Sequence, residues 1–175
     1  MESAPALNAQ RLESSRLVLE PLRVDHASEL QPVLDDPSLH RFTGGSPATA
    51  EELRERFERQ VLGHSPDGRA AWLNWVVRER ATARVVGTVQ ATVKDGPIRT
   101  AELAWVVGTQ HQGNGFAREA AATMAEWLHE QGVTRLRANI NPRHHASIAV
   151  AQAIGLEPTG TIVDGEARWE SRPAA

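Results

Sequence analysis

The stretch TQHQGNGFAREAAATM, from Thr109 to Met124, links a strand-like run to an alanine-rich helix through Gly113 and Gly115. Glycine lacks a Cβ atom, so another molecule can come close to the backbone of such a turn. The first N–H groups of the helix behind it have no intrahelical acceptors, and the helix dipole makes this end positive. The stretch therefore predicts an anion-binding turn for which a pyrophosphate is the natural guest. A tight turn that binds nothing is the alternative.

Two common phosphate-binding motifs do not fit this stretch. A dinucleotide-binding fingerprint needs a third glycine where Arg118 stands, and an acidic residue about 20 positions further on, where this chain reads RANIN. A P-loop needs Gly-Lys-Ser or Gly-Lys-Thr, whereas Gly115 is followed by Phe-Ala. Both motifs are therefore excluded.

The hydrophobic pattern on either side of the turn predicts a mixed α/β fold in one domain. The expected strands cover residues 16–22, 71–79, 83–93, 100–108, 133–141 and, as a pair that turns at Asp164-Gly165, 156–171. The expected helices cover residues 24–42 with a break at Pro37, 49–63, about 115–131, and 144–155. An antiparallel meander comes first, and the strand, glycine turn, helix and strand after it are expected to form a right-handed parallel crossover.

Composition narrows the class of protein. The 175 residues are 41% hydrophobic and 23% charged and include no cysteine, which fits one folded domain in a reducing, cytoplasmic compartment. The net charge of −3 at pH 7 argues against nucleic-acid binding, and no apolar run approaches the length of a membrane span. Residues 1–14 lack a signal-peptide pattern and are expected to be a flexible leader before a domain over residues 15–171.

Taken together, these residues resemble the GCN5-related N-acetyltransferases. The family's Gln/Arg-x-x-Gly-x-Gly/Ala loop stands here as Gln112 to Ala117. The runs SRLVLEPLR, AELAWVVG and HHASIAVAQAIGLEPTG resemble the first strand, the fourth strand, and the last helix with its following strand in the branch of ribosomal-protein alanine acetyltransferases. The resemblance implies a mixed, mostly antiparallel central sheet with helices on both faces and a strand–glycine loop–helix cofactor site.

The resemblance also implies direct transfer of an acetyl group from acetyl-CoA to a primary amine, without an acyl-enzyme. It places the pyrophosphate on the loop amides, the pantetheine arm along the strand before the loop, and a backbone N–H near Val107 on the thioester carbonyl oxygen. The residues so implied to bind the cofactor are Val106, Val107, Gln112, Gly113, Asn114, Gly115, Phe116, Ala117, Arg118, His144 and Ser147.

The reaction needs a base for the incoming ammonium and an acid for the leaving thiolate. Glu102 is the candidate base, on the strand face that also carries Ala104 and Val106; a structural glutamate paired with an arginine is the alternative. Much of the family has a tyrosine as the acid, and its position here is Ala151. Ser147 is the substitute, unless it only caps its own helix, and His144 or water are the other choices.

The sequence does not name the acceptor, which is expected to be a small-molecule amine or a protein N-terminus. Acidic residues near the last hairpin, Asp164, Glu166 and Glu170, could attract a cationic acceptor. Because the family's tyrosine is absent, a non-catalytic acyl-CoA-binding module is the second hypothesis. The histidines lack the spacing of a zinc motif, so no metal is expected. A homodimer is compatible with the sequence.

Overall fold

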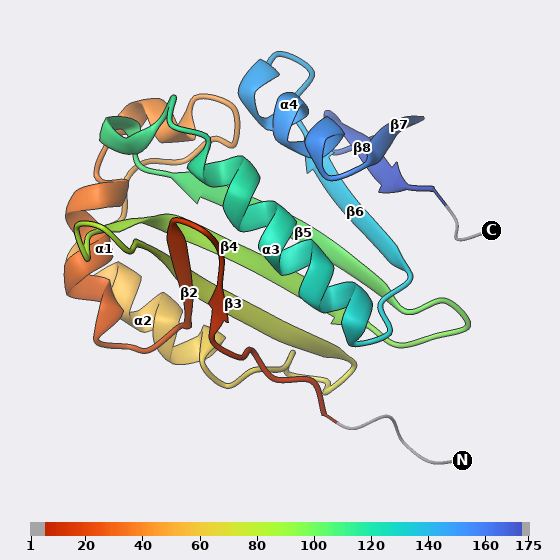
Figure 1. The fold of residues 1–175 in the computed structure, drawn as a ribbon, viewed down its shortest axis with the longest axis horizontal. Coiled ribbons are helices and arrows are strands. Elements are labelled where there is room, and N and C mark those ends of the chain that lie inside the picture. The colour runs from red at the N-terminus through yellow and green to blue at the C-terminus, as the bar shows by residue number, and fades with distance from the viewer. Residues whose placement is uncertain (1–5, 173–175) are drawn as a thin grey trace.

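The central sheet has eight strands in the part of the chain that the computed structural model describes, residues 6–172 (Figure 1). In chain order the strands are β1 (Leu12–Glu13), β2 (Leu17–Pro21), β3 (Ala70–Glu79), β4 (Val85–Lys94), β5 (Thr100–Val107), β6 (Arg135–Ile140), β7 (Leu156–Val163) and β8 (Glu166–Ser171). They lie in the order β1-β2-β3-β4-β5-β6-β8-β7, and every neighbouring pair is antiparallel except β5–β6, which is parallel. The predicted mixed, mostly antiparallel sheet is therefore confirmed.

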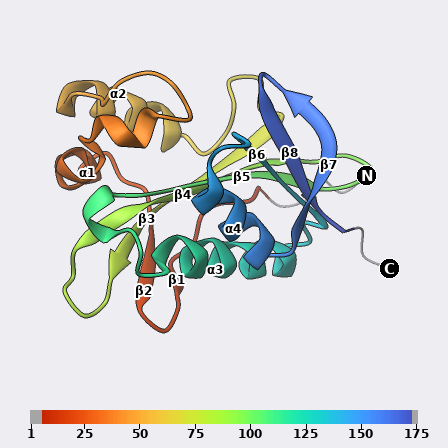
Figure 2. The same ribbon diagram turned by 90° about the horizontal axis from the view of Figure 1, so that it is seen from above.

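Helices cover both faces of this sheet (Figure 2). α1 (His26–Leu34) and α2 (Ala50–Gln60) lie on one face, and α3 (Phe116–Glu130) and α4 (His145–Ala153) lie on the other. The helix expected over residues 24–42 is shorter, because α1 ends at Leu34 and a 3₁₀ turn, η1 (Pro37–His40), follows. α2 begins with a capping box between Thr49 and Glu52. No helix within residues 6–172 is long and apolar enough to cross a membrane.

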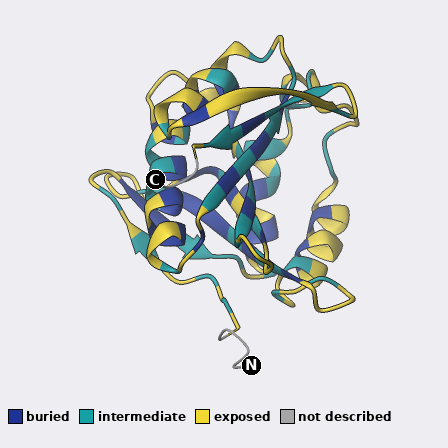
Figure 3. Cartoon of the chain, turned by 90° about the vertical axis from the view of Figure 1, so that its right-hand side faces the viewer, coloured by how far each residue is buried: buried dark blue, intermediate teal, exposed yellow. Residues whose placement is uncertain are grey.

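The larger core lies between the sheet and α3 (Figure 3). Alternation along β3 turns Leu73, Trp75 and Val77 towards this side, and all three are fully buried. Trp75 meets Trp127 of α3 edge to face, with ring centroids 5.6 Å apart. A second, smaller cluster fills the other side under α1 and α2: Ala27, Leu30, Leu53, Phe57, Val76 and Val85.

Part of the segment expected to be a flexible leader lies on the sheet. Leu12 and Glu13 form β1, which pairs with β2. The indole N–H of Trp75 donates to the carbonyl oxygen of Gln10 at 2.7 Å, which ties the chain before β1 to the core. Residues 1–5 lie outside the described part of the chain.

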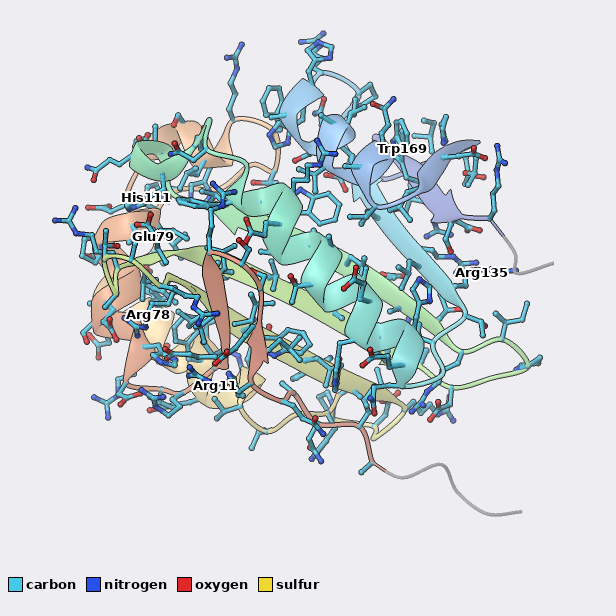
Figure 4. All side chains as sticks on the ribbon, viewed as in Figure 1. Arg11, Arg78, Glu79, His111, Arg135 and Trp169 are labelled. Atoms are coloured by element: carbon cyan, nitrogen blue, oxygen red, sulfur yellow. The ribbon has the colours of Figure 1, made fainter. Side chains whose placement is uncertain are left out.

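A polar network around Arg78, which is labelled in Figure 4, joins α1 to the sheet. The fully buried His26 accepts a hydrogen bond from the backbone N–H of Arg23 at Nδ1, 3.0 Å away, and its Nε2 lies 3.3 Å from the Glu20 carboxylate. Arg78 bridges two carboxylates, with Nε 2.7 Å from Glu20 Oε1 and Nη1 2.9 Å from Glu29 Oε2. Each buried charge in the network therefore has an opposite partner.

Acid is expected to destabilise the fold in two steps. Burial holds the pKa of His26 below its ordinary value of 6.5, so the unfolded chain takes up this proton more readily. The contribution of the neutral His26 to the free energy of unfolding is complete above pH 6.5 and is lost as the pH falls from there through the lowered pKa of the folded state. Hydrogen bonds from Arg78 lower the pKa of Glu20 and of Glu29 below 4.5, so a second loss follows at lower pH.

Calorimetric unfolding scans between about pH 7.5 and about pH 5 test the first step. The unfolding midpoint of His26→Gln should fall less steeply with pH than that of the wild type. The exposed His145 is the matched control, and His145→Gln should keep the wild-type slope. Equal slopes for wild type and His26→Gln would contradict this role of His26.

Candidate functional site

The glycine turn before α3 presents a row of free backbone N–H groups. Gly113 and Gly115 both have φ of +79°, a conformation that favours glycine, and α3 begins at Phe116 with no side chain capping its N-terminus. Within residues 6–172, no protein atom accepts a hydrogen bond from the backbone N–H groups of residues 113–118. The side-chain amide of Asn114 donates back to the His111 carbonyl at 3.1 Å and holds the turn open. The turn therefore has the form that binds anions.

Arg16 supports this turn from behind. Its Nη1 donates to the Asn114 carbonyl oxygen at 2.9 Å, and its Nε lies 2.7 Å from Glu119 Oε2 in the first turn of α3. The guanidinium also stacks over the Phe116 ring at 4.9 Å. The SRLVLEPLR run that contains Arg16 carries no sign of this contact with the turn, so the role of Arg16 could not be predicted from the sequence.

Arg16→Ala is expected to weaken binding at the turn without abolishing it. The substitution removes the hydrogen bond to Asn114 and leaves Glu119 without its cation, so the turn loses its fixed position. One charge-assisted hydrogen bond is worth about 1.5–3 kcal/mol, so the KM for acetyl-CoA should rise about tenfold while kcat changes little. Arg80→Ala, which removes a hydrogen bond to the Ser14 carbonyl oxygen and no contact with the glycine turn, is the control. An unchanged KM for acetyl-CoA would contradict the role of Arg16.

The edge of β5 next to the turn is open. β5 pairs with β6 only from Thr100 to Glu102, and beyond that point β6 diverges towards α4 (Figure 1). Gly108 donates its N–H to Val86 in β4, so by alternation the N–H groups of Trp105 and Val107 point away from β4 into the gap. The Gln112 side chain donates to the Val107 carbonyl oxygen at 3.0 Å and fastens the glycine turn to this edge.

α4 begins on the other side of the gap and carries Ser147 and His144. Ser147 is buried, and its Oγ lies 3.4 Å from His144 Nε2 rather than capping α4. The His144 ring stacks on Phe42 with centroids 4.6 Å apart, and burial lowers the pKa of His144 below its ordinary value. Ala151, at the position of the family's tyrosine, is fully buried in the core. The two acid candidates thus lie in contact with each other.

Glu102 lies on the sheet face opposite α3, as its alternation with Ala104 and Val106 predicted. Arg137, the neighbour of Glu102 on β6, pairs instead with Glu170 of β8, with Nε and Oε1 2.7 Å apart. The negative charge of Glu170 is therefore already paired with the Arg137 guanidinium. Burial and the nearby Asp164 raise the pKa of Glu166 above its ordinary value. Of these carboxylates, Glu102 is the one on the strand that ends at the glycine turn.

A cavity of about 210 Å³ lies between this sheet face and the α1–α2 segment. Ala104, Trp105 and Val106 line it from β5, beside the open edge of the strand. A second hollow of about 280 Å³ adjoins it further along β3 and β4. The residues common to both are Arg56, Gln60, Asn74 and Gln90. The cavity of about 210 Å³ and the glycine turn therefore both lie next to the C-terminal end of β5.

Within residues 6–172, no group of three or more His, Cys, Asp or Glu side chains is placed to hold a metal ion.

Comparisons with known proteins agree with this geometry. A relative from Bacillus licheniformis, "Uncharacterized N-acetyltransferase p20", is 24% identical over 158 residues, which cover 90% of this chain and 88% of that protein. The solved ribosomal-protein-S5-alanine acetyltransferase from Vibrio fischeri is 18% identical, with a TM-score of 0.76 over 94% of this chain and 97% of that one. The Microcin C7 self immunity acetyltransferase MccE, solved with acetyl-CoA and AMP, is 15% identical, with a TM-score of 0.73 over 90% of this chain and 93% of that one.

At identities of 15–18% the two solved structures establish only a shared fold. Membership of a family is established by the match of the sequence to a family model. Residues 16–157 match the family described as "Acetyltransferase (GNAT) domain". This range includes β2, the glycine turn, all of α3 and all of α4. The resemblance seen in the sequence is therefore confirmed, and the chain belongs to the GNAT family of acetyltransferases.

Proposed function

We propose that this protein transfers an acetyl group from acetyl-CoA directly to a primary amine. One observation carries the proposal: the row of unpaired N–H groups over residues 113–118, at the positive end of α3 and beside the open edge of β5. Unpaired N–H groups at the N-terminus of a helix are typical of sites that bind a phosphate or pyrophosphate. The gap between β5 and β6 fits an extended arm that adds to β5 in the manner of a strand.

The open edge of β5 supplies the groups that orient the thioester. The N–H groups of Trp105 and Val107 point into the gap, and the Val107 carbonyl is already engaged by Gln112. We assign the Val107 N–H to the thioester oxygen, where it stabilises the negative charge that develops as the amine attacks. Fixing both reactants at this point supplies the remainder of the rate enhancement, because no covalent enzyme intermediate is required.

Ser147 is assigned the proton for the leaving thiolate. The hydroxyl lies at the α4 side of the gap, and the neighbouring His144 is held neutral at pH 7 because burial lowers its pKa. A neutral imidazole can orient the hydroxyl towards the sulfur, and the serine oxygen then regains its proton from water. The tyrosine that much of the family uses has no equivalent here, because its position is occupied by the buried Ala151.

Ser147→Ala is expected to lower kcat about tenfold and to leave the KM of acetyl-CoA nearly unchanged, because the hydroxyl matters most when the thiolate leaves. Steady-state rates from the release of free CoA thiol measure both constants. Ser147→Cys keeps a proton donor at the position and should recover part of the rate. An unchanged kcat in Ser147→Ala would move the role to His144 or to water.

Titration calorimetry with acetyl-CoA, desulfo-CoA, NAD and ATP tests the binding half of the proposed function. Both CoA compounds should bind, and NAD and ATP should not. Mass spectrometry of an amine library incubated with acetyl-CoA then tests transfer. A protein that binds CoA but acetylates no amine would be the acyl-CoA-binding module, a reading that the buried Ala151 favours. A folded protein that binds no CoA compound would overturn the proposal.

A further inference from the structure

The cavity beside β5 has a one-sided charge. Arg56 lines both hollows. Arg59 lines only the hollow of about 280 Å³, and His40 lines only the cavity of about 210 Å³ next to β5. No carboxylate lines either hollow in the described part of the chain. The whole chain has a net charge of −3, so this basic lining is a local feature.

Of the three arginines of α2, Arg56 and Arg59 are not neutralised by carboxylates of their own helix. Arg54, on the same helix, pairs with Glu58 at 3.5 Å, and the Glu52 carboxylate accepts the backbone N–H of Thr49 in the capping box. Among residues 6–172, no carboxylate oxygen lies within 4.0 Å of the guanidinium of Arg56 or Arg59. Their charges therefore remain available to a ligand in the cavity.

Amide side chains line the floor between these arginines and the end of β5. Gln90 of β4 lies opposite Ala104 of β5 on one side and opposite Asn74 of β3 on the other. Strand spacings of ~4.8 Å and a rise of ~3.3 Å per residue put Asn74 roughly 12 Å from Val106. The arginine side chains extend into the cavity, so the distance from the Arg56 guanidinium to Val106 is shorter than this backbone distance. A ligand that reaches from Val106 to Arg56 is therefore a chain of several bonds.

We propose that the acceptor is a small primary amine that carries an anionic group, a carboxylate or a phosphate, at the end opposite the amine. The inference rests on the proposed function, because the amine end is defined by the thioester site at Val107. Arg56 and Arg59 bind the anion, Asn74 and Gln90 bind polar groups between, and Phe57 packs against the apolar stem. A cationic acceptor is disfavoured, since the arginines would repel it.

The volume of the cavity argues for a small molecule. The two adjoining hollows, of about 210 Å³ and about 280 Å³, together lie in the lower half of the range of roughly 300–1,000 Å³ that is typical of small-molecule pockets. The apolar lining of the cavity next to β5, which includes Leu34, Leu39 and Phe57, is suited to a short alkyl stem. An ω-amino acid is the simplest molecule that has this stem and both charged ends.

Acetylation of matched acceptors tests the proposal. 6-Aminohexanoate and β-alanine are compared with 6-aminohexanamide and β-alaninamide, each at saturating acetyl-CoA. The longer acid should exceed its amide in kcat/KM by about 10- to 100-fold, as expected for a charge-assisted pair of hydrogen bonds. β-Alanine should show a smaller preference over its amide because it is too short to span the cavity.

Variants of α2 identify the groups responsible. Arg56→Gln and Arg59→Gln, alone and together, should remove the preference for the acid, because kcat/KM for 6-aminohexanoate falls to the level of 6-aminohexanamide. Arg54→Gln is the matched control on the same helix and should keep the preference. Equal kcat/KM for acid and amide in the wild type, or the same loss in Arg54→Gln, would overturn the proposal.

Two further outcomes separate this inference from the proposed function. If acetyl-CoA binds and an uncharged peptide amide with a free N-terminus is acetylated better than both acids, the small anionic acceptor is overturned and the acetyltransferase stands. If acetyl-CoA does not bind and no amine is acetylated, the proposed function fails, and the assignment of the acceptor is overturned with it.

Discussion

Gly115→Asp should abolish acetyl-CoA binding while leaving the fold intact. A carboxylate at this position would stand among the free N–H groups of residues 113–118, where the pyrophosphate is proposed to bind. Two unit charges 4 Å apart repel each other by about 4 kcal/mol at an effective dielectric constant near 20. Each 1.4 kcal/mol is a factor of ten, so the dissociation constant should rise about 100- to 1,000-fold.

The fold should tolerate this aspartate. A Cβ atom on Gly115 would meet only the Arg16 guanidinium, at 3.4 Å, which is an ordinary van der Waals contact. Asparagine and aspartate adopt positive φ more readily than other residues, and an acidic side chain at a helix N-terminus is favourable by about 0.3–1 kcal/mol. The thermal midpoint should therefore stay within a few degrees of the wild type, by roughly the shift that 1 kcal/mol produces.

Gly132→Asp is the matched control. Gly132 follows the other end of α3, has φ of +81°, and has no atom within 4 Å of its would-be Cβ. The control carries the same side chain on the same type of backbone, without helix-dipole support, so it should lose more stability than Gly115→Asp. It should still bind acetyl-CoA with wild-type affinity in calorimetry. Wild-type affinity in Gly115→Asp would place the pyrophosphate elsewhere.

The fold was predictable because its signals are local. The positive φ at Gly113 and Gly115, the alternation along β5 and the capping box at Thr49 depend on residues a few positions apart. Such spacings can be recognised in one sequence, and so the glycine turn, β5 and α3 were predicted close to their observed bounds. The two-residue strand β1 was not, because a pairing that short leaves no periodicity.

The site was only partly predictable because its remaining contacts are not local. Arg16 reaches the glycine turn from β2, and Arg137 takes Glu170 rather than the adjacent Glu102. The basic lining of the cavity was hidden in the same way. The acidic residues of the last hairpin favour a cationic acceptor, whereas Arg56 and Arg59 lie on a helix whose carboxylates outnumber its arginines. Local charge is set by which side chains face the cavity, and this depends on tertiary packing.

Glu102→Gln should lower kcat about 100-fold and leave acetyl-CoA affinity unchanged, if Glu102 is the base. The side chain lies on the cavity side of β5, five residues before Val107, or roughly 16 Å along the strand. A carboxylate at that distance can take up the proton only along a chain of several water molecules. Glu126→Gln, an exposed carboxylate on α3, is the control for the change in net charge.

The pH dependence separates a base from a structural glutamate. An alkyl amine with a pKa of about 10 arrives mostly as ammonium near neutral pH, but much of it is already free amine at about pH 9.5. The difference in kcat/KM between Glu102→Gln and the wild type should therefore shrink as the pH rises, because the removed base is no longer needed. A constant difference together with weakened acetyl-CoA binding would make Glu102 a structural residue. Full turnover in Glu102→Gln at neutral pH would mean that water alone carries the proton from the acceptor.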